Sequence, residues 1–355
     1  MNKHVVRQLH LWLSVPFGIV IIILCLSGAI LLFERDYGHL GQAEVDPAGR
    51  TPVSLDSIMR EVERTLPEDK YITGVTIYPD EYHAYKVSIN KPVMSAVWVD
   101  QYSGKVIGEY KRAKIFKIAS SAHRRLFGNS KSQGASGTNV GKLVVGISAI
   151  VLIVIVATGL ILWWPMRKSF VDQLRWGHGK KSYKRWYDLH CTTGVISALV
   201  LILCVLTGLT WSFGWYKKAF YGVLGSEVAK SSRNSEQSKN FEVWDTAVSE
   251  LPKDDCYKEI RIYQGRIDVM NEGYGNQQAS DTYLYDEESG RITKKIAYCE
   301  KPRADKIKGW IYTLHVGSWA RHASRNLYIC IMLFGVFLPI SGYYLWIKRI
   351  RRSHK

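Results

Sequence analysis

Four long apolar runs constrain the fold of this chain more than any other feature of its sequence. They cover residues 11–33, 140–164, 192–215 and 327–347. Each contains about twenty residues or more, which at about 1.5 Å of rise per residue matches a hydrocarbon core about 30 Å thick. The first run continues into FERDYGHL without a small-residue cleavage site, so we expect a retained anchor and not a signal peptide. The sequence therefore predicts four transmembrane helices.

The distribution of the net charge of +17 predicts the orientation of these helices. Residues 165–187 contain seven Lys or Arg and a single acid, Asp172, and the C-terminal tail adds five more basic residues. The long connections, 34–139 and 216–326, carry nearly balanced charge. Because short basic segments stay in the cytoplasm, both termini and the middle loop are expected inside and the long connections outside. Topology explains the excess charge, so nucleic-acid binding is not expected.

The chain contains an internal duplication. LHLWLSVPFGIVIIILCLSG at 9–28 and LHCTTGVISALVLILCVLTG at 189–208 both begin with Leu-His and end with Ser-Gly or Thr-Gly. Further along, VWVDQYSGKVI resembles YLYDEESGRIT, and TGLILWWPMRK resembles SGYYLWIKRIR. A unit of helix, outer domain and helix is thus used twice. Both copies run in the same sense, so we expect a two-fold axis along the membrane normal.

Each outer segment is predicted to form a small α+β module. A helix is expected at 54–66, with Ser54 as its N-cap, and another at 241–251. Alternating segments such as YKVSI, SAVWVDQ and GKVIGEY in the first copy, and EIRIY, RIDVM and TYLYDEE in the second, predict antiparallel strands. Turns are expected at Ser103-Gly104 and Ser289-Gly290. The fold class is therefore a membrane protein of α plus α+β type.

The predicted organisation follows the duplication. In chain order it consists of transmembrane helix 1 (1–36), a first outer module (37–118), an outer histidine segment with transmembrane helix 2 (119–168), a basic cytoplasmic loop (169–187), transmembrane helix 3 (188–216), a second outer module (217–308), and transmembrane helix 4 with a basic cytoplasmic tail (309–355).

Four of the ten histidines are paired by the duplication. His10 matches His190 at the cytoplasmic ends of the first and third helices, and His123 matches His315 just before the second and fourth helices. Two-fold symmetry brings the members of each pair together, so each side of the membrane has two facing imidazoles. Paired imidazoles from separate helices are what a six-coordinate haem iron needs. Two nitrogen ligands without a carboxylate or thiolate cluster make a poor zinc site.

Residues near the four histidines fit a haem site but also have ordinary structural interpretations. Small residues follow the inner ligands at helical spacing, where they would admit a macrocycle or allow close helix packing: Ser14, Gly18, Gly194 and Ala198. Nearby basic or aromatic residues would bind haem propionates or form a membrane-boundary belt: Arg7, Lys184, Arg185 and Trp186 at the inner pair, and Arg124, Arg125 and Arg321 at the outer pair. His322 lies seven residues after His315, on the same predicted helical face, and is a rival ligand.

The six cysteines have no metal-binding spacing. Cys25, Cys204 and Cys330 lie in apolar runs and are predicted to be core residues, and Cys191 a packing residue. Cys256 and Cys299 share one outer segment, so a disulfide and two free thiols both remain open.

The histidine motifs resemble those of the bacterial PepSY-associated transmembrane family, which includes inner-membrane ferric-siderophore reductases. The resemblance rests on Leu-His at the first helix, AHRRLFG before the second, DLH at the third, and TLHVG before a final helix ending in SGYYLWIKR, and it covers nearly the whole chain. It implies a four-helix domain at the bacterial inner membrane with PepSY-like modules in the periplasm. It also implies two haem b groups, with His10, His123, His190 and His315 as iron ligands.

The function expected from these observations is transmembrane electron transfer. The protein would then be an oxidoreductase. A cytoplasmic or quinone donor would reduce the inner haem, and the outer haem would reduce a periplasmic ferric siderophore or another acceptor. Two alternatives remain, an envelope regulator whose modules bind peptidases or other proteins, and a small transporter, which the nearly uncharged helices disfavour. The chain contains no Ser-His-Asp, P-loop, GxGxxG or HExxH pattern, so hydrolase and nucleotide-driven functions have no support.

Overall fold

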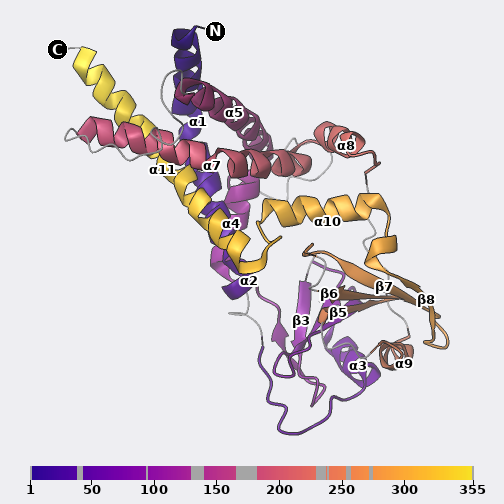
Figure 1. Cartoon of the computed structure of the whole chain (residues 1–355). Helices are drawn as coiled ribbons and strands as arrows, with labels where there is room; N and C mark the ends of the chain where they lie inside the picture. The colour runs from indigo at the N-terminus through magenta and orange to yellow at the C-terminus, as the bar shows by residue number, and fades with distance from the viewer. Residues whose placement is uncertain are drawn as a thin grey trace. The chain divides into compact units, whose positions relative to one another are not determined.

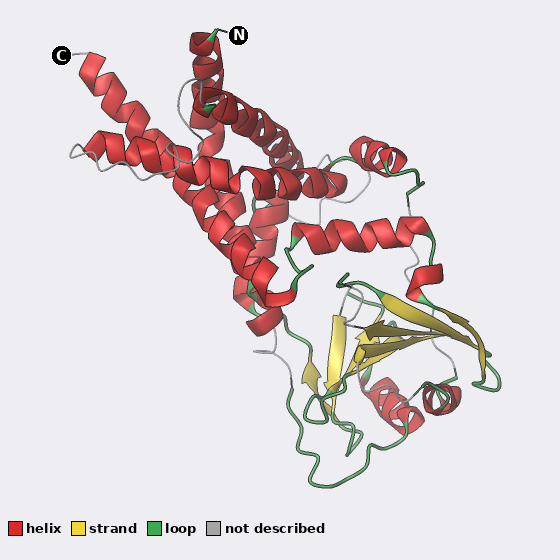
Figure 2. Cartoon of the chain, in the orientation of Figure 1, coloured by secondary structure: helices red, strands yellow, loops and turns green. Residues whose placement is uncertain are grey.

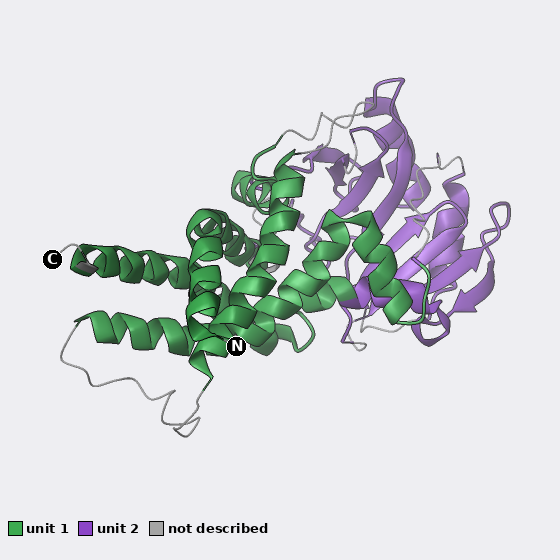
Figure 3. Ribbon diagram, turned by 90° about the horizontal axis from the view of Figure 1, so that it is seen from above, with its two compact units in different colours: residues 1–36, 114–227, 311–355 green, residues 37–113, 228–310 purple. Residues whose placement is uncertain are grey.

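The computed structural model describes most of the chain (Figure 1). The described residues are 2–37, 43–92, 95–128, 140–164, 182–228, 237, 240–252, 257–271 and 275–353. They divide into two compact units, each of which combines segments from both halves of the sequence (Figure 3). Unit 1 comprises residues 1–36, 114–227 and 311–355, and unit 2 comprises residues 37–113 and 228–310.

Unit 1 contains the four helices that the apolar runs predict. They are α1 (Lys3–Leu32), α5 (Val140–Trp163), α7 (Ser182–Ser212) and α11 (Arg321–Ser353). All four are long and apolar enough to cross a membrane. Three of them begin well before their apolar runs, because polar residues add helical turns outside the span that hydrocarbon requires.

The four long helices pack with the symmetry that the duplication predicts. Helix α1 packs against α5 and α11, and α7, its counterpart in the second repeat, packs against the same two helices. Their shared core consists of Ile21, Cys25, Ala29, Leu201, Ile331 and Met332. Gly335 of α11 lies so close to α1 that a Cβ added there would be 2.6 Å from Sγ of Cys25. The close approach explains why a small residue is used at this crossing.

Short helices precede the second long helix of each repeat. These are α4 (Lys114–Arg125) and α10 (Arg303–His315); α2 (Glu34–Tyr37) and α8 (Gly214–Val223) follow α1 and α7. Helix α10 ends at His315, and the backbone turns through Gly317 and Arg321, which both have positive φ. His322 therefore lies on a different helix from His315, and the prediction that the two share a helical face is wrong.

Unit 2 is built around one antiparallel sheet of eight strands. The strands are β1 (Ile72–Ile77), β2 (Tyr85–Ile89), β3 (Ser95–Val99), β4 (Val106–Glu109), β5 (Tyr257–Tyr263), β6 (Arg266–Asn271), β7 (Ser280–Tyr285) and β8 (Ile292–Ile296). Their order in the sheet is β4-β3-β2-β1-β5-β6-β7-β8. The modules predicted separately are therefore joined edge to edge, by pairing of β1 with β5 at the centre.

Two helices cover one face of this sheet. Helices α3 (Leu55–Thr65) and α9 (Glu242–Ser249), one from each module, lie together on the same side of the strands (Figure 2). Ile58, Met59 and Trp244 are fully buried against the sheet. Both helices were predicted, because each presents apolar residues at helical spacing.

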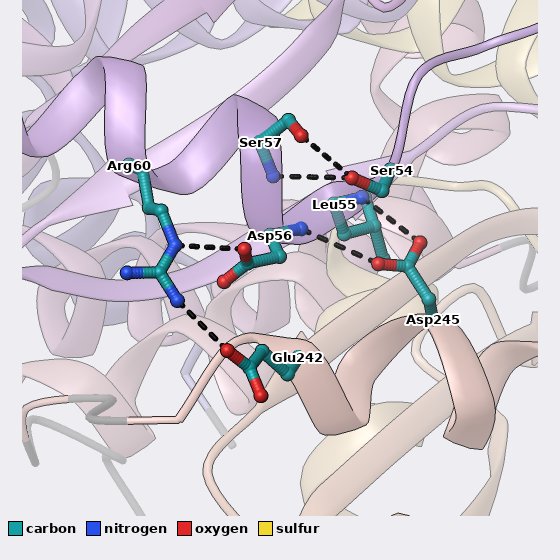
Figure 4. Close-up of polar contacts among 7 residues, drawn as sticks. All are labelled: Ser54, Leu55, Asp56, Ser57, Arg60, Glu242 and Asp245. Carbon is teal, nitrogen blue, oxygen red and sulfur yellow. Dashed lines mark hydrogen bonds and ion pairs between the residues drawn. The ribbon is translucent and has the colours of Figure 1, made fainter.

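A polar network links the N-terminus of α3 to α9 (Figure 4). The Ser54 side chain accepts a hydrogen bond from the amide of Ser57, as predicted for an N-cap. The Asp245 carboxylate, from the other module, accepts hydrogen bonds from the amides of Leu55 at 2.9 Å and Asp56 at 3.3 Å. Three amides of the first turn are thus satisfied, two of them by the neighbouring repeat.

The two predicted turns are confirmed and have the same geometry. Gly104 and Gly290 have φ of +74° and +73°, and their amides donate to the carbonyls of Asp100 and Asp286 at 2.8 and 2.9 Å. Positive φ at this position favours glycine, which explains why Ser-Gly recurs in both modules.

The cysteine predictions have mixed outcomes. Cys25 is buried and Cys191 and Cys204 are half-buried, but Cys330 is exposed on the surface of α11 and is not a core residue. A hydrophobic residue can face outward on a membrane-spanning helix, because lipid and not water surrounds that helix. Cys299 is an exposed free thiol, and Cys256 lies outside the described residues.

Substituting Asp245 tests the link between the modules. Asp245→Ala leaves two amides of α3 without their acceptor, which is expected to cost about 1–3 kcal/mol. Hydrogen–deuterium exchange of the 55–65 peptide in the full-length protein should therefore accelerate. Glu242→Ala is the matched control, since it removes only an exposed ion pair with Arg60. Equal exchange in the two variants would contradict the capping role.

Candidate functional site

The structure brings the four predicted histidines together in two pairs, all within unit 1. The rings of His10 in α1 and His190 in α7 have centroids 6.5 Å apart and planes at 90°. The rings of His123 in α4 and His315 in α10 have centroids 6.1 Å apart and planes at 65°. In each pair, the two rings come from corresponding positions of the two repeats.

Each imidazole of the first repeat is held by a neighbouring helix through its Nδ1 atom. Nδ1 of His10 lies 3.0 Å from the carbonyl oxygen of Ile155 and 3.0 Å from Oγ1 of Thr158, both in α5. Nδ1 of His123 lies 2.9 Å from the carbonyl oxygen of Leu24 and 3.2 Å from Oγ of Ser27, both in α1. The oxygens thus belong to a carbonyl and to a hydroxyl three residues later.

The second repeat has the same arrangement. Nδ1 of His315 lies 3.0 Å from the Cys204 carbonyl oxygen and 3.0 Å from Oγ1 of Thr207, both in α7. Nδ1 of His190 lies 2.8 Å from Oγ of Ser341, and the carbonyl of Leu338 in α11 also accepts from this histidine. All four anchors therefore use a carbonyl at one position and a Ser or Thr hydroxyl three positions later.

This anchoring fixes which nitrogen carries the proton. A carbonyl oxygen can only accept, so Nδ1 must be the protonated donor in His10, His123 and His315. The Ser341 hydroxyl donates its own proton to Leu338, so it accepts from Nδ1 of His190 in the same way. Nε2 is then the nitrogen with a free lone pair. The arrangement matches that of metal-binding histidines, in which the second ring nitrogen donates to a carbonyl and orients the ligand.

The separation of the rings fits two imidazoles on opposite sides of one metal atom. A metal–imidazole bond is about 2 Å and the bonded nitrogen lies roughly 1 Å from the ring centre, so the centroids are expected about 6 Å apart. Both observed separations agree with this value. Within the described parts of the chain, no group of three or more His, Cys, Asp or Glu side chains could hold a metal ion. Two neutral imidazoles are a donor set that haem iron accepts.

His123 and His315 are both half-buried. Burial lowers the pKa of His123. Burial, followed by the neighbouring His123, lowers the pKa of His315 to about 4. Both rings are neutral at neutral pH, which is the state that a metal ligand requires.

A glycine lies beside every one of the four rings. A Cβ added to Gly208, Gly28 or Gly159 would lie 3.1, 3.2 or 3.3 Å from Cε1 of His315, His123 or His10 respectively. At Gly342 the corresponding distance, to Cε1 of His190, is 3.6 Å. Each glycine directly follows the hydroxyl residue that contacts the same ring. The missing side chain lets the imidazole edge lie against the helix backbone.

The small residues predicted near the inner pair serve helix packing. A Cβ at Gly18 would lie 2.5 Å from the hydroxyl oxygen of Tyr343, and this hydroxyl donates to the carbonyl of Val15 at 2.6 Å. At Gly194, the nearest atom to an added Cβ is Cδ2 of Leu338, 3.5 Å away. Ala198 is buried, and the hydroxyl of Ser14 donates to the carbonyl of His10. Of the two predicted interpretations, close packing therefore describes Gly18.

The predicted propionate-binding residues differ in exposure. Arg7, Arg124, Lys184, Arg185 and Arg321 are exposed, and Arg125 is half-buried. The Nε atom of Arg125 is buried and has no hydrogen-bond partner among the residues that the structure describes. Trp186 stacks on Phe337 of α11 with ring centroids 5.6 Å apart, so it packs within the bundle. Arg125 is thus the candidate with an unused buried donor close in sequence to a ligand.

The other histidines that the structure describes lie outside the two pairs. His322, the rival ligand, is exposed and its Nδ1 lies 3.2 Å from Arg325, so it does not replace His315. His83 pairs with Asp80 at 2.7 Å. His4 is exposed near the N-terminus. Three more histidines fall outside the described residues: His39, His178 and His354.

The hydroxyl anchors were missed by the sequence analysis. Ser27 and Thr207 were recognised only as part of the repeated Ser/Thr-Gly ends, and Thr158 and Ser341 only as the first residues of the matching segments TGLILWWPMRK and SGYYLWIKRIR. The usable signal was that each of the four apolar runs has a Ser/Thr-Gly dipeptide in its C-terminal half, although the third run also has Thr193-Gly194 close to His190. Sequence alone does not tell which histidine meets which helix.

The chain belongs to a known membrane-protein family. The family model described as the PepSY-associated TM region matches residues 7–349, which is nearly the whole sequence. A comparison with curated proteins found no match. The protein is therefore a multi-pass membrane protein of the PepSY-associated type.

The glycine distances predict different tolerances for the same substitution. Gly208→Ala forces a methyl group to 3.1 Å from His315, whereas Gly342→Ala places one at an ordinary 3.6 Å from His190. Overpacking is expected to cost about 1–3 kcal/mol at Gly208, offset in part by the higher helix propensity of Ala, which acts equally at both sites. Thermal unfolding in detergent should show Gly208→Ala as the less stable variant. The reverse order would contradict the packing described above.

Proposed function

We propose that this protein is a di-haem b oxidoreductase that transfers electrons across the bacterial inner membrane to a periplasmic ferric complex, in particular an Fe(III) siderophore. The observation that carries the proposal is the pair of imidazoles at each end of the bundle, with ring separations of 6.5 and 6.1 Å and every Nδ1 anchored. An envelope regulator or a transporter has no need of this repeated geometry.

The residues proposed to hold the cofactors are the paired histidines. His10 and His190 would hold one haem, and His123 and His315 the other. Haem iron with two histidine ligands supplies reversible one-electron transfer and leaves no open position for oxygen chemistry. Arg125, whose buried Nε has no partner within the described ranges, is the best supported propionate partner. Arg7, Arg124 and Arg185 remain proposed partners at the surface.

The orientation follows from charge. The His10–His190 pair lies at the end of the bundle that carries the N-terminus of α1 and the basic end of α11, and the sequence that leads into α7, 165–187, is also basic. Positive residues favour the cytoplasm, so this end is proposed to face a cytoplasmic or quinone electron donor. The His123–His315 end would then face the periplasm.

Exposed aromatic residues support an acceptor site near the outer pair. The ring of Trp211 lies 5.1 Å from that of His315 and is 45% exposed. It therefore provides a direct contact between a proposed ligand and the surface of unit 1. Trp319 is also exposed and lies four residues after His315. Hard oxygen ligands bind Fe(III) better than Fe(II), so reduction would release iron from the complex.

Haem content tests the proposed ligands. His190→Ala should lose one of two haems and keep the other, because each pair belongs to a separate site, and His315→Ala should lose the second. The pyridine haemochrome spectrum and protein concentration give the stoichiometry. His322→Ala is the control and should retain both haems. A colourless wild-type protein would exclude the proposal and favour a regulator; full haem content in His190→Ala and His315→Ala would exclude these ligands.

Electron transfer can be measured in proteoliposomes that enclose a ferric hydroxamate with an Fe(II) chelator, with dithionite added outside. The wild-type protein should produce the coloured Fe(II) chelate. His123→Ala should abolish this signal because the outer site loses a ligand, and protein-free vesicles give the background. An unchanged rate in His123→Ala would contradict electron transfer through the outer pair.

A further inference from the structure

Four Ser/Thr-Gly dipeptides of the long helices, each beside a histidine ring, form one repeated structural element. Each contributes a hydroxyl within 2.8–3.2 Å of a histidine Nδ1 and a glycine beside the same ring. The four elements are Ser27-Gly28 with His123, Thr158-Gly159 with His10, Thr207-Gly208 with His315, and Ser341-Gly342 with His190. Each lies on a different long helix, so every long helix provides one such element.

The hydroxyl protons are already used within the helices. Thr158 and Thr207 donate to the carbonyls of Val154 and Leu203, four residues earlier, both at 2.7 Å. Ser27 donates to Ile23 at 2.6 Å, and Ser341 to Leu338 at 2.9 Å. Ser and Thr commonly form such bonds inside helices. With its proton directed along the helix, each hydroxyl oxygen has a lone pair facing Nδ1 and acts as an acceptor.

The geometry points to Ser27, Thr158, Thr207 and Ser341 as positioning residues that hold the Nδ1 proton of each haem ligand and thereby lower the reduction potential of the iron. This inference rests on the proposed function, because it requires iron at Nε2. It assigns a role to four residues that do not themselves touch the iron.

The physical basis is the charge on the imidazole. An N–H shared between two acceptors, a carbonyl and a hydroxyl, gives the ring more negative character and makes Nε2 a stronger donor. A stronger donor stabilises Fe(III) relative to Fe(II), so the potential falls. The carbonyl cannot be removed by mutation, whereas the hydroxyl can. The side chain is thus the part of the anchor through which the sequence can adjust each iron separately.

A purely structural role predicts something different. A back-bonded Thr at a helix contact stabilises packing without affecting the electronic state of a ligand. Thr193 in α7 provides the matched control, because its hydroxyl donates to the carbonyl of Leu189 at 2.7 Å in the same way. It is buried, as Thr158 and Thr207 are.

The experiment is a potentiometric titration of the full-length protein carrying Thr158→Val, Thr207→Val or Thr193→Val. Val keeps the shape of Thr and removes the acceptor. Thr158→Val should raise the midpoint potential of one haem, and Thr207→Val should raise that of the other. Each rise is expected to be about 59 mV, which corresponds to a tenfold change in the Fe(II)/Fe(III) ratio for one electron. Thr193→Val should change neither. Thr158→Ser and Thr207→Ser should restore wild-type potentials, because the oxygen is restored.

The outcomes separate this inference from the proposed function. Two haems with unchanged potentials in both Val variants would overturn the inference and leave the electron-transfer function intact. A wild-type protein without haem would overturn both. Shifts of equal size in Thr193→Val would overturn the inference, since they would reflect packing alone. If a Val variant does not fold, Ser27→Ala and Ser341→Ala test the equivalent hydroxyls at His123 and His190.

Discussion

The bond from histidine Nδ1 to a main-chain carbonyl of a neighbouring helix is the interaction on which the rest of the membrane unit depends. An imidazole within an apolar bundle is costly unless its polar atoms are satisfied. Here Nδ1 has two oxygen neighbours in His10, His123 and His315, and that of His190 has the Ser341 hydroxyl. The bonds run from α1 to α5, from α7 to α11, from α4 to α1 and from α10 to α7. They therefore tie the helices to one another while leaving the same nitrogen, Nε2, available in every ring.

Duplication explains why one anchoring solution appears four times. The two repeats place equivalent histidines opposite each other, and the same symmetry joins β1 to β5 at the centre of the sheet in unit 2. In both units, the contact at the centre is made between repeats. A single repeat would leave one imidazole of each pair without its mate and β1 with an open edge, so neither unit is complete from one half of the sequence.

Much of the fold could be predicted because its elements have strong local signals. The apolar runs fixed the four long helices, Ser54 and the apolar spacing of 54–66 predicted α3, and Ser-Gly predicted both turns. Strand β1 was missed because all six of its residues are buried, so it lacks the alternation that marks a strand with one exposed face. The prediction that His315 and His322 share a helical face was wrong, because the backbone turns at Gly317, which has positive φ, and the two residues lie on different helices.

The sequence by itself determined which residues are duplicated, which segments are apolar enough to span a bilayer, and which histidines are paired. These properties follow from composition and spacing along one chain. Only the tertiary structure decided that the modules share one sheet, that Tyr343 fills the space at Gly18, and that each histidine meets a Ser/Thr-Gly on another helix. Periodicity tells which side of a helix a residue occupies, but the neighbour that it meets is set by how helices distant in sequence pack together.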